Sequence, residues 1–178
     1  MADIDQSVLI RPARLSDVDA IISVDIAASA LFKPTGLLSD DALNDHVEAP
    51  NVRAAIDAGL IDVAEIVSEP RVAGFIQYRL IDGDLYLEQV SVDPAYGRRG
   101  VGRRLMSWLD QRAITLGAHQ ITLSTFRDLA WNGPFYASVG FEEIPRGDMQ
   151  DYMLEIEAAQ APFMDVSKRI FMIKTVRN

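Results

Sequence analysis

The stretch from Leu85 to Leu109, LYLEQVSVDPAYGRRGVGRRLMSWL, decides the fold of this chain. Its pattern predicts a buried strand, a turn at Asp93-Pro94, a loop rich in glycine and arginine, and then a helix. The first N–H groups of a helix lack partners within the helix and carry partial positive charge, so they form a natural anion site. The loop glycines are Gly97, Gly100 and Gly102, and the arginines are Arg98, Arg99, Arg103 and Arg104. Small residues let a ligand approach and guanidinium groups suit phosphate oxygens, so the stretch predicts a pyrophosphate pocket.

The residues after Gly102 predict a helix with one apolar face. Apolar side chains recur there at three- and four-residue spacing, and Gly117 is the expected C-terminal cap. They are Leu105, Trp108, Leu109, Ala113 and Leu116. We expect this face, Trp108 included, to pack against a sheet.

Two common phosphate-binding motifs do not match this loop. The dinucleotide pattern G-x-G-x-x-G fails because Leu105 stands three residues after Gly102, and the P-loop pattern G-x-x-x-x-G-K-[ST] is absent. The run from Gly97 to Gly102 instead resembles the acetyl-CoA-binding motif of the GNAT superfamily of N-acetyltransferases, written Q/R-x-x-G-x-G/A. Gly97 stands where that family prefers Gln or Arg.

A second segment, Ile121 to Phe141, supports the resemblance independently. Its sequence, ITLSTFRDLAWNGPFYASVGF, is similar to the family's second motif, with Asn132, Tyr136 and the pair Gly140-Phe141 in the expected order. VLIRPARLSDVDAI at the start is similar to the family's first strand and helix. The resemblance implies an α/β fold whose mixed, mostly antiparallel central sheet is flanked by helices.

The same resemblance implies a reaction and its residues. It implies acetyl-CoA as acyl donor, with direct attack by a primary amine in a ternary complex, and the chain has no cysteine for a covalent acyl-enzyme. Glu88 occupies the position from which many members draw a carboxylate that accepts the amine proton. Tyr136 is placed to protonate the leaving sulfur. The implied cofactor contacts are Val90, Ser91, Val92, Arg98, Arg99, Gly100, Val101, Gly102, Arg103, Asn132 and Tyr136.

Each catalytic or binding residue has a structural alternative. Strand alternation places Glu88 with Val90 and Val92 on one face; an ordinary solvated charge or an arginine partner is the alternative to a catalytic role. Tyr136 could be a packed aromatic, and Asn132 could be a helix N-cap. Phe32, Lys33 and Trp131 are further candidates for contact with the acceptor, and a role in packing alone stays open for each.

Alternative functions also stay open. The protein could transfer another acyl group or use a hydroxyl acceptor, or it could be a CoA-binding sensor that has lost catalysis. The presence of Glu88 and Tyr136 favours the enzyme, whereas a Glu88 held in a salt bridge or a blocked acceptor side would favour the sensor.

Composition sets further bounds. With 178 residues, 49% of them hydrophobic, and no low-complexity linker, we expect one domain over residues 1–178. The N-terminus MADIDQSVLIRP lacks the continuous apolar segment of a signal peptide, and no stretch has the ~18 consecutive apolar residues of a membrane-spanning helix. Cysteine is also absent. We therefore expect a cytoplasmic protein without membrane partners. Two histidines, His46 and His119, are predicted to be a surface residue and a strand-entry residue, and no metal site is expected.

Charge and one strand bear on partners. The net charge of −9 argues against nucleic acid and would suit an amine acceptor, either a small molecule or an amine of a protein. The final strand RIFMIKTV has the alternation of an exposed edge that could form a homodimer, and a core strand is the alternative.

The remaining elements follow from turn and cap signals. Ser16 with Asp19 resembles a capping box before a helix whose apolar face holds Val18, Ile21, Ile22 and Ile26. Ser39 is a candidate cap, and Pro50 should separate helices at 40–48 and 52–58 that form a lid on the substrate side. Turns at Glu69-Pro70 and Asp82-Gly83 predict an antiparallel meander. The expected strands are 9–12, 61–68, 72–80, 84–92, 120–125, 141–144 and 168–176, with a helix at 149–159.

Overall fold

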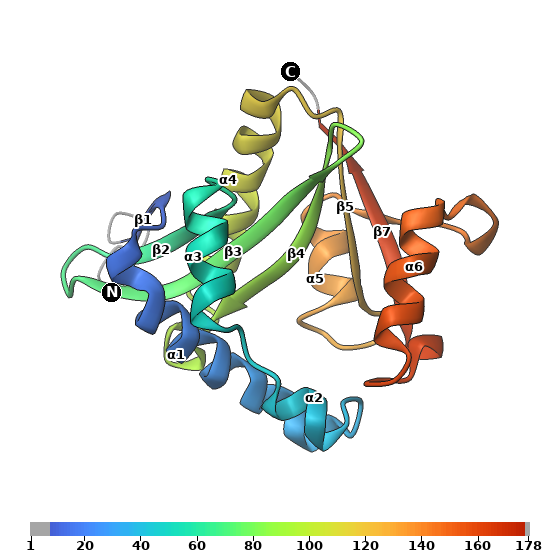
Figure 1. Ribbon diagram of the computed structural model, residues 1–178, viewed down its shortest axis with the longest axis horizontal. Helices are drawn as coiled ribbons and strands as arrows, with labels where there is room; N and C mark the ends of the chain where they lie inside the picture. Colours follow the sequence, from blue (N-terminus) through green and yellow to red (C-terminus); the bar gives the residue numbers. More distant parts are fainter. Residues whose placement is uncertain (1–7, 177–178) are drawn as a thin grey trace.

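A seven-stranded sheet forms the centre of the computed structural model, which describes residues 8–176; the first seven residues of the N-terminal stretch lie outside the described residues. The strands follow the order β1-β2-β3-β4-β5-β7-β6, and among them the β4–β5 pair alone is parallel (Figure 1). Their bounds are β1 (Val8–Pro12), β2 (Ile61–Ile66), β3 (Arg71–Ile81), β4 (Asp84–Val92), β5 (Gln120–Phe126), β6 (Glu142–Glu143) and β7 (Arg169–Thr175). The predicted mixed, mostly antiparallel sheet is confirmed.

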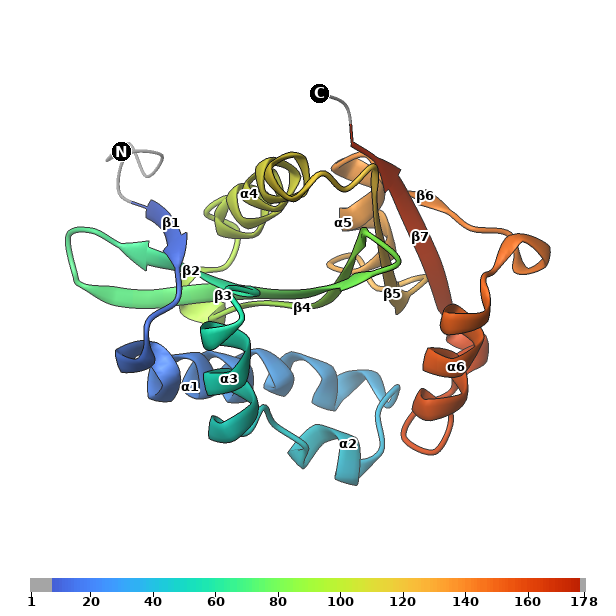
Figure 2. The same ribbon diagram turned by 45° about the horizontal axis from the view of Figure 1, so that its top comes forward.

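Helices cover both faces of the sheet. Figure 2 shows α1 and α3 on one face and α4 and α5 on the other. The helices are α1 (Val18–Ser29), α2 (Asp40–Asn44), α3 (Ala49–Asp57), α4 (Val101–Leu116), α5 (Gly133–Ser138) and α6 (Asp151–Gln160). The chain crosses from β4 to β5 through α4, as a parallel pair requires.

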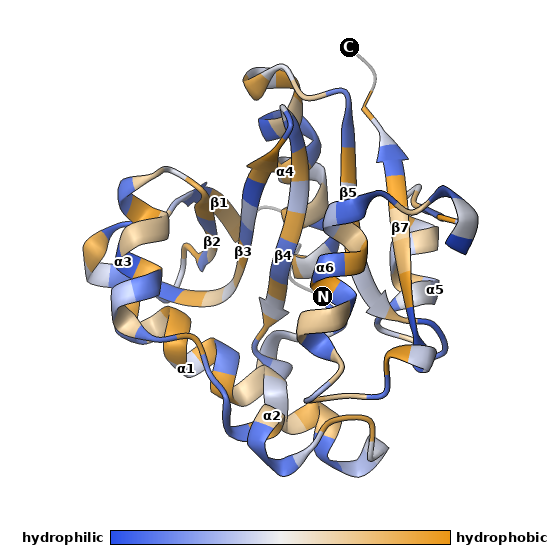
Figure 3. Ribbon diagram, turned by 45° about the vertical axis from the view of Figure 1, so that its right-hand side comes forward, coloured by the Kyte–Doolittle hydropathy of each residue, from blue (hydrophilic) through white to orange (hydrophobic). Residues whose placement is uncertain are grey.

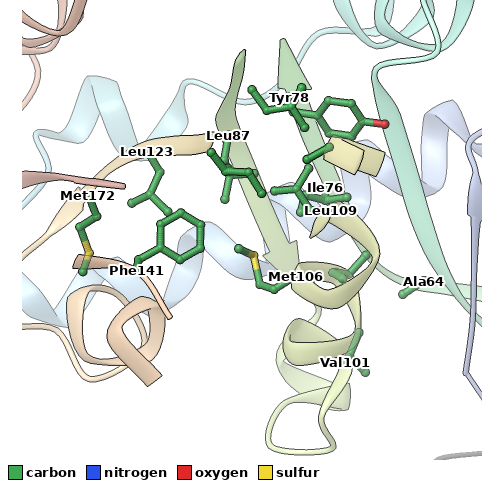
Figure 4. Packing of buried hydrophobic residues seen from close by; sticks show 14 of the residues in the cluster. Ala64, Ile76, Tyr78, Leu87, Val101, Met106, Leu109, Leu123, Phe141 and Met172 are labelled. Atoms are coloured by element: carbon green, nitrogen blue, oxygen red, sulfur yellow. The ribbon is translucent and has the colours of Figure 1, made fainter. Parts of the chain in front are cut away.

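The main core lies between the sheet and α4. Leu105, Met106 and Leu109 of α4 pack against apolar side chains of the central strands, among them Ile76 and Leu87 (Figure 4). Colouring by hydropathy shows apolar and polar residues interchanging along the central strands (Figure 3). The predicted helix and its glycine cap are confirmed, since Gly117 has a left-handed conformation.

The apolar faces of α4 and α1 are rotated from those predicted. Leu116 is exposed and Trp108 only half-buried, because the buried face of α4 runs through Met106 instead. On α1, Ile26 is exposed and its neighbour Asp25 is buried. This rotation brings an acidic side chain onto the sheet, where it takes part in the site described below.

Local signals in the N-terminal half were partly right. Ser39 caps α2 by accepting a hydrogen bond from the Ala42 N–H at 3.1 Å, as predicted. The Ser16–Asp19 capping box was wrong, because Asp17 reaches back to accept from the Arg14 N–H at 2.7 Å. Pro50 does not separate two helices but lies in the first turn of α3, where its missing N–H has no intrahelical partner to lose.

Turns join the central strands as the sequence predicted. Asp82 and Gly83 have φ angles of 52° and 89°, which is the conformation that closes a tight β3–β4 hairpin. The final strand pairs with β5 along its length, as the core-strand alternative expects. On its other side, β6 pairs with it only at Met172 and Ile173, so the rest of that side has no partner strand among residues 8–176.

Candidate active site

The two parallel strands at the centre of the sheet separate after a short pairing. β4 and β5 pair only at Leu85–Leu87, and Figure 1 shows them diverging from there. Among residues 8–176, the edge of β4 at Val90, Ser91 and Val92 therefore has no partner strand on the β5 side, although its other edge remains paired with β3. Unpaired N–H and C=O groups at such an edge can bind an extended ligand as an additional strand would.

The loop that follows β4 leads directly to the start of α4. After the 3-10 turn Pro94–Tyr96, Arg98 and Gly100 adopt left-handed conformations with φ of 59° and 79°, and α4 begins at Val101. The N–H groups of Val101 and Gly102 belong to the first turn, whose donors lack intrahelical partners. The loop is thus shaped to present backbone donors at its mouth.

The arginines of this loop do not all point the same way. Arg98, Arg99 and Arg103 are exposed; Arg99 lies over the Tyr96 ring at 5.6 Å, and Arg103 donates to Ser138 Oγ at 3.0 Å. Arg104 instead donates from Nη2 to the Val8 carbonyl at 2.9 Å, so it ties α4 to β1. Three positive side chains therefore surround the helix start.

Strand alternation predicted that Glu88 shares a face with Val90 and Val92. In the structure it does not. Gln77 of β3 pairs with Gln89, yet the next residue, Tyr78, pairs with Leu87, so Glu88 is the extra residue of a β-bulge. Val90 and Val92 pack toward the main core. Glu88 and Gln89 instead both line a cleft on the α1–α3 face.

The Glu88 carboxylate has two polar partners. Gln77 Nε2 donates to Glu88 Oε2 at 3.2 Å, and Arg79 Nε lies 3.3 Å from Glu88 Oε1. The Glu88 side chain nevertheless remains 31% exposed. Partly exposed ion pairs of this kind contribute little to stability, so this pairing leaves Glu88 accessible to a ligand in the cleft.

The cleft has a volume of about 550 Å³ and lies between β3–β4 and the segment from α1 to α3. Its polar lining includes Asp25, His46, Gln77, Glu88 and Gln89. His46 was predicted to be a simple surface residue, and this was wrong: its Nδ1 is buried and lies 3.4 Å from Asp25 Oδ2. His119, in contrast, is exposed at the entry to β5, as predicted.

Tyr136 lies on α5, on the opposite face of the sheet from this cleft. Its ring contacts Phe135 and Phe141 edge-on, with centroids 5.3 and 5.9 Å apart, and packs against the main core. Burial raises the pKa of the Tyr136 phenol above its ordinary value, although the charge of Arg169 acts in the opposite direction. The hydroxyl makes no hydrogen bond within residues 8–176, so it is available to donate to a ligand.

Asn132 stands at the N-cap position of α5, but its side chain does not cap the helix. Its Oδ1 accepts from Thr125 Oγ1 at 2.8 Å and from the Phe126 N–H at 3.4 Å. The N-cap alternative is therefore right about the position of Asn132, but the side chain makes no capping hydrogen bond. Asn132 ties the start of α5 to the diverging end of β5.

The three weaker acceptor candidates lie near this end of β5. Phe32 contacts both Phe126 and Trp131, with ring centroids 6.0 and 6.2 Å apart, and Trp131 is 45% exposed. Lys33 is exposed beside Phe32. Phe32 and Trp131 thus form one aromatic surface with β5, and within residues 8–176 no hydrogen bond, ion pair or ring contact joins Lys33 to it.

Sequence reasoning missed Asp25, Gln89 and Arg169. Asp25 follows Ile21 by four residues, so a charged residue on a predicted apolar helix face was the available signal. Arg169 lies at the start of β7, with its guanidinium 4.7 Å from the Phe126 ring centroid and Nε donating to Ser124 Oγ at 3.2 Å. Burial lowers the pKa of Arg169 to about 10, while Tyr86 and Tyr136 oppose that shift. No local sequence signal distinguishes this arginine.

Within the described part of the chain, no helix is both long and apolar enough to cross a membrane.

Comparison with known proteins identifies the family. The model of the Acetyltransferase (GNAT) family matches residues 35–141, which is more than half of the chain. Among solved structures, a PaiA N-acetyltransferase from Thermoplasma acidophilum in complex with coenzyme A is 16% identical, with a TM-score of 0.73 and coverage of 95% of this chain and 99% of that one. A GNAT-family acetyltransferase from Staphylococcus aureus Mu50 is 19% identical, with a TM-score of 0.70 and coverage of 96% and 100%.

A third match covers only part of a larger protein. N-acetylglutamate synthase from Neisseria gonorrhoeae, complexed with coenzyme A and N-acetyl-glutamate, is 14% identical with a TM-score of 0.73; the match covers 96% of this chain but 35% of the synthase. At these identities the structural likenesses establish the fold, and the family model establishes the membership. The chain therefore belongs to the GNAT acetyltransferase family, a family of acyl-CoA-dependent acyltransferases.

Proposed function

We propose that this protein transfers the acetyl group of acetyl-CoA to a primary amine, by direct attack of the amine in a ternary complex. One observation carries the proposal: the pairing of β4 with β5 ends at Leu87, and the unpartnered edge that follows leads straight to the N-terminus of α4. An edge that can bind amides and a helix start that can bind phosphate occur in the order in which a CoA molecule presents those groups.

The residues of the predicted cradle fit this co-substrate. Arg98, Arg99 and Arg103 are exposed around the helix start, where their charge would complement a pyrophosphate. The N–H groups of Val101 and Gly102 and the flexible approach at Gly100 supply the backbone part of the cradle. A Cβ added to Gly102 would stand 3.4 Å from the Phe135 ring, so α4 and α5 meet closely at this point. Val90, Ser91 and Val92 would hold the pantetheine arm through their backbone.

Bound acetyl-CoA supplies an activated acyl group. Glu88 then accepts a proton from the amine nitrogen on the cleft side of the sheet, and Tyr136 donates its phenolic proton to the sulfur from the α5 side. The opposite placement of the two groups supports this division, since acyl transfer needs a base beside the nucleophile and an acid beside the leaving group. Asn132 would orient the α5 start that carries Tyr136.

The amine itself enters from the α1–α3 side in this proposal. The cleft there contains Asp25, Asp45, Glu48 and Glu88, and such a lining suits a cationic acceptor before it loses its proton. Both a small-molecule amine and an amine of a protein fit a cleft that is open to solvent.

The Arg79–Glu88 ion pair is the observation that favours a CoA-binding sensor instead. In that alternative the pair would hold Glu88 away from any acceptor. The exposure of both partners and the open cleft beside them weigh against it, because an exposed pair is worth at most about 1 kcal/mol.

Calorimetry and a thiol-release assay test the proposal together. Acetyl-CoA, CoA and ATP are titrated into the wild type and into an Arg99→Ala/Arg103→Ala variant, and release of free CoA is then followed with a series of primary amines. Arg53→Ala/Lys168→Ala is the matched control, because it removes two exposed positive charges outside the loop.

The proposal expects acetyl-CoA binding that the loop variant loses and the control keeps, with CoA release that depends on an amine. Binding without release on any amine would favour the sensor. Absence of acetyl-CoA binding to the wild type would overturn the cofactor assignment and every role derived from it.

A further inference from the structure

His46 and Asp25 form a buried pair in the acceptor cleft, and neither belongs to a motif that the sequence singled out. His46 lies between α2 and α3, whereas Asp25 lies on α1. Nδ1 of His46 is buried without a hydrogen bond in the described residues and is 3.4 Å from Asp25 Oδ2. The His46 side chain as a whole is 24% exposed, so the exposed part of the ring lies away from Nδ1.

Asp25 is firmly positioned. Its side chain is 6% exposed, and Oδ2 accepts a hydrogen bond from the Val47 N–H at 3.0 Å. Oδ1 accepts from Nε2 of Gln89 on β4. Because Val47 adjoins His46, the same carboxylate fixes the backbone next to the imidazole as well as facing its Nδ1.

This arrangement selects one form of the imidazole. A carboxylate facing Nδ1 favours the tautomer with its proton on that atom, which leaves the lone pair on Nε2. The acid of a catalytic triad faces and orients its imidazole in the same way. Nδ1 and Oδ2 are 3.4 Å apart without a hydrogen bond between them in the described residues, and contacts at catalytic sites often tighten only when substrate binds.

We propose that His46 is a second proton acceptor of this enzyme, which takes the first proton from the incoming ammonium group, and that Asp25 is its positioning residue. The inference rests on the proposed function, because it assigns a further role within the same acceptor cleft. Glu88 is bonded to Gln77 and Arg79 in this cleft, whereas the exposed edge of the His46 ring has no hydrogen-bond or ion-pair partner in residues 8–176.

Two proton acceptors match the balance of the reaction. A primary ammonium must lose one proton before its nitrogen has a lone pair, and a second when the amide forms. His46 Nε2 takes the first and releases it to solvent. The nitrogen then bonds to the thioester carbon, Glu88 takes the second proton, and the carbon–sulfur bond breaks as Tyr136 protonates the sulfur. The Glu88 proton returns to Tyr136 through solvent, so the net products are the amide, the thiol and one free proton.

The charged groups around His46 suit this first step. Those lining the cleft with it are acidic: Asp25 from α1, Asp45 and Glu48 from its own segment, and Glu88 from β4. Together they favour an ammonium group near the imidazole. When the proton moves from the ammonium group to the imidazole, the positive charge stays within the same acidic cleft.

The test separates the first proton transfer, to His46, which only a charged amine needs, from the second, to Glu88, which every amine needs. The kcat/KM for CoA release is measured from about pH 6 to about pH 9 for wild type, His46→Gln, Asp25→Asn and Glu88→Gln. The acceptors are spermidine, L-lysine, L-glutamate and a peptide with N-terminal alanine. His119→Gln is the matched control, since the chain has two histidines and His119 is exposed outside the cleft.

The expected result is a loss of about 100-fold for His46→Gln at the acid end, which shrinks as rising pH supplies neutral amine, and a smaller loss of the same form for Asp25→Asn. Glu88→Gln should lose activity at every pH. Free imidazole should restore activity to His46→Ala but not to Glu88→Ala. Urea unfolding and acetyl-CoA titration of each variant show whether its fold and cofactor binding are intact.

Two outcomes would overturn the inference. In the first, the kcat/KM of His46→Gln equals that of His119→Gln at every pH. In the second, His46→Gln loses the same factor of kcat/KM at every pH and free imidazole does not restore activity to His46→Ala, which would show that His46 and Asp25 are purely structural. If the wild type binds acetyl-CoA but acetylates none of the amines, the proposed function itself is contradicted, and the role of His46 is contradicted with it.

Discussion

Gln89 on β4 donates a hydrogen bond from its amide nitrogen to the buried carboxylate of Asp25 on α1. The same amide lies 3.1 Å from Ser91 Oγ, two residues further along the strand. This contact connects the unpaired edge of β4, where the co-substrate is proposed to bind, with the helix that positions His46. It exists because the bulge at Glu88 turns Gln89 toward α1.

Replacing Gln89 by Met should weaken both the fold and the acceptor site. The thioether has a similar length but no amide donor, so Asp25 Oδ1 would remain buried without a hydrogen bond at a cost of about 1–3 kcal/mol. Urea unfolding should show this loss, and the KM for the amine should rise more than the affinity for acetyl-CoA falls. Gln111→Met, an exposed substitution on α4, is the control; equal effects of the two would contradict a specific Gln89–Asp25 link.

Tyr136→Phe should reduce turnover without reducing stability. The hydroxyl has no hydrogen-bond partner in the described chain, so its removal leaves the edge contacts with Phe135 and Phe141 in place. Loss of a general acid should lower kcat by about 100-fold, with acetyl-CoA affinity nearly unchanged. Because burial raises the pKa of the Tyr136 phenol, it stays protonated across the neutral range and should set no inflection in the pH profile there. Unchanged kcat in the variant would remove Tyr136 from the mechanism.

Local patterns predicted the elements that form around the loop. The strand, the glycine-rich turn and the helix from Val101 to Leu116 depend on contiguous residues, so turn chemistry and apolar periodicity were sufficient. The Asp82-Gly83 hairpin followed in the same way, because few residues accept the left-handed conformations it needs.

The cleft where we propose that the acceptor binds depends on contacts that no local pattern contains. A bulge shifts strand alternation by one residue, and nothing in the sequence around Glu88 announces it. His46 and Asp25 are far apart along the chain and meet because α1 is rotated and the segment before α3 folds back over it. The sequence therefore predicted the strand, loop and helix from β4 to α4 better than it predicted the lining of the cleft on the α1–α3 face.

Asp17 should make stability depend on acid pH. Burial raises the pKa of this carboxyl, but hydrogen bonds from Arg11 and from the Arg14 N–H outweigh it, so the pKa lies below its ordinary value. A lowered pKa in the folded state means that the stabilisation is present above the ordinary Asp value of about 4 and is lost as pH falls through the lowered pKa.

Asp17→Asn should accordingly cost about 2 kcal/mol near neutral pH, because it weakens the paired contact with Arg11. Urea unfolding at several pH values should show the difference from wild type shrinking as the pH falls below about 4. Asp57→Asn, at an exposed position, serves as the reference. A difference that stays constant down to low pH would show that Asp17 acts through packing and not through its charge.

Gly133→Ala should disturb the site through the backbone. A Cβ at this position would clash with the carbonyl oxygen of Arg127, and because that atom belongs to the backbone, the turn between β5 and α5 must shift to admit it. The expected cost is about 1–3 kcal/mol in urea unfolding. Gly147→Ala is the matched control, since a Cβ there meets no described atom within 4 Å and should change stability by less than about 0.5 kcal/mol. Because α5 carries Tyr136, Gly133→Ala should also lower kcat at saturating amine; a variant that lost stability but kept full kcat would show that the position of α5 is not important for the chemistry.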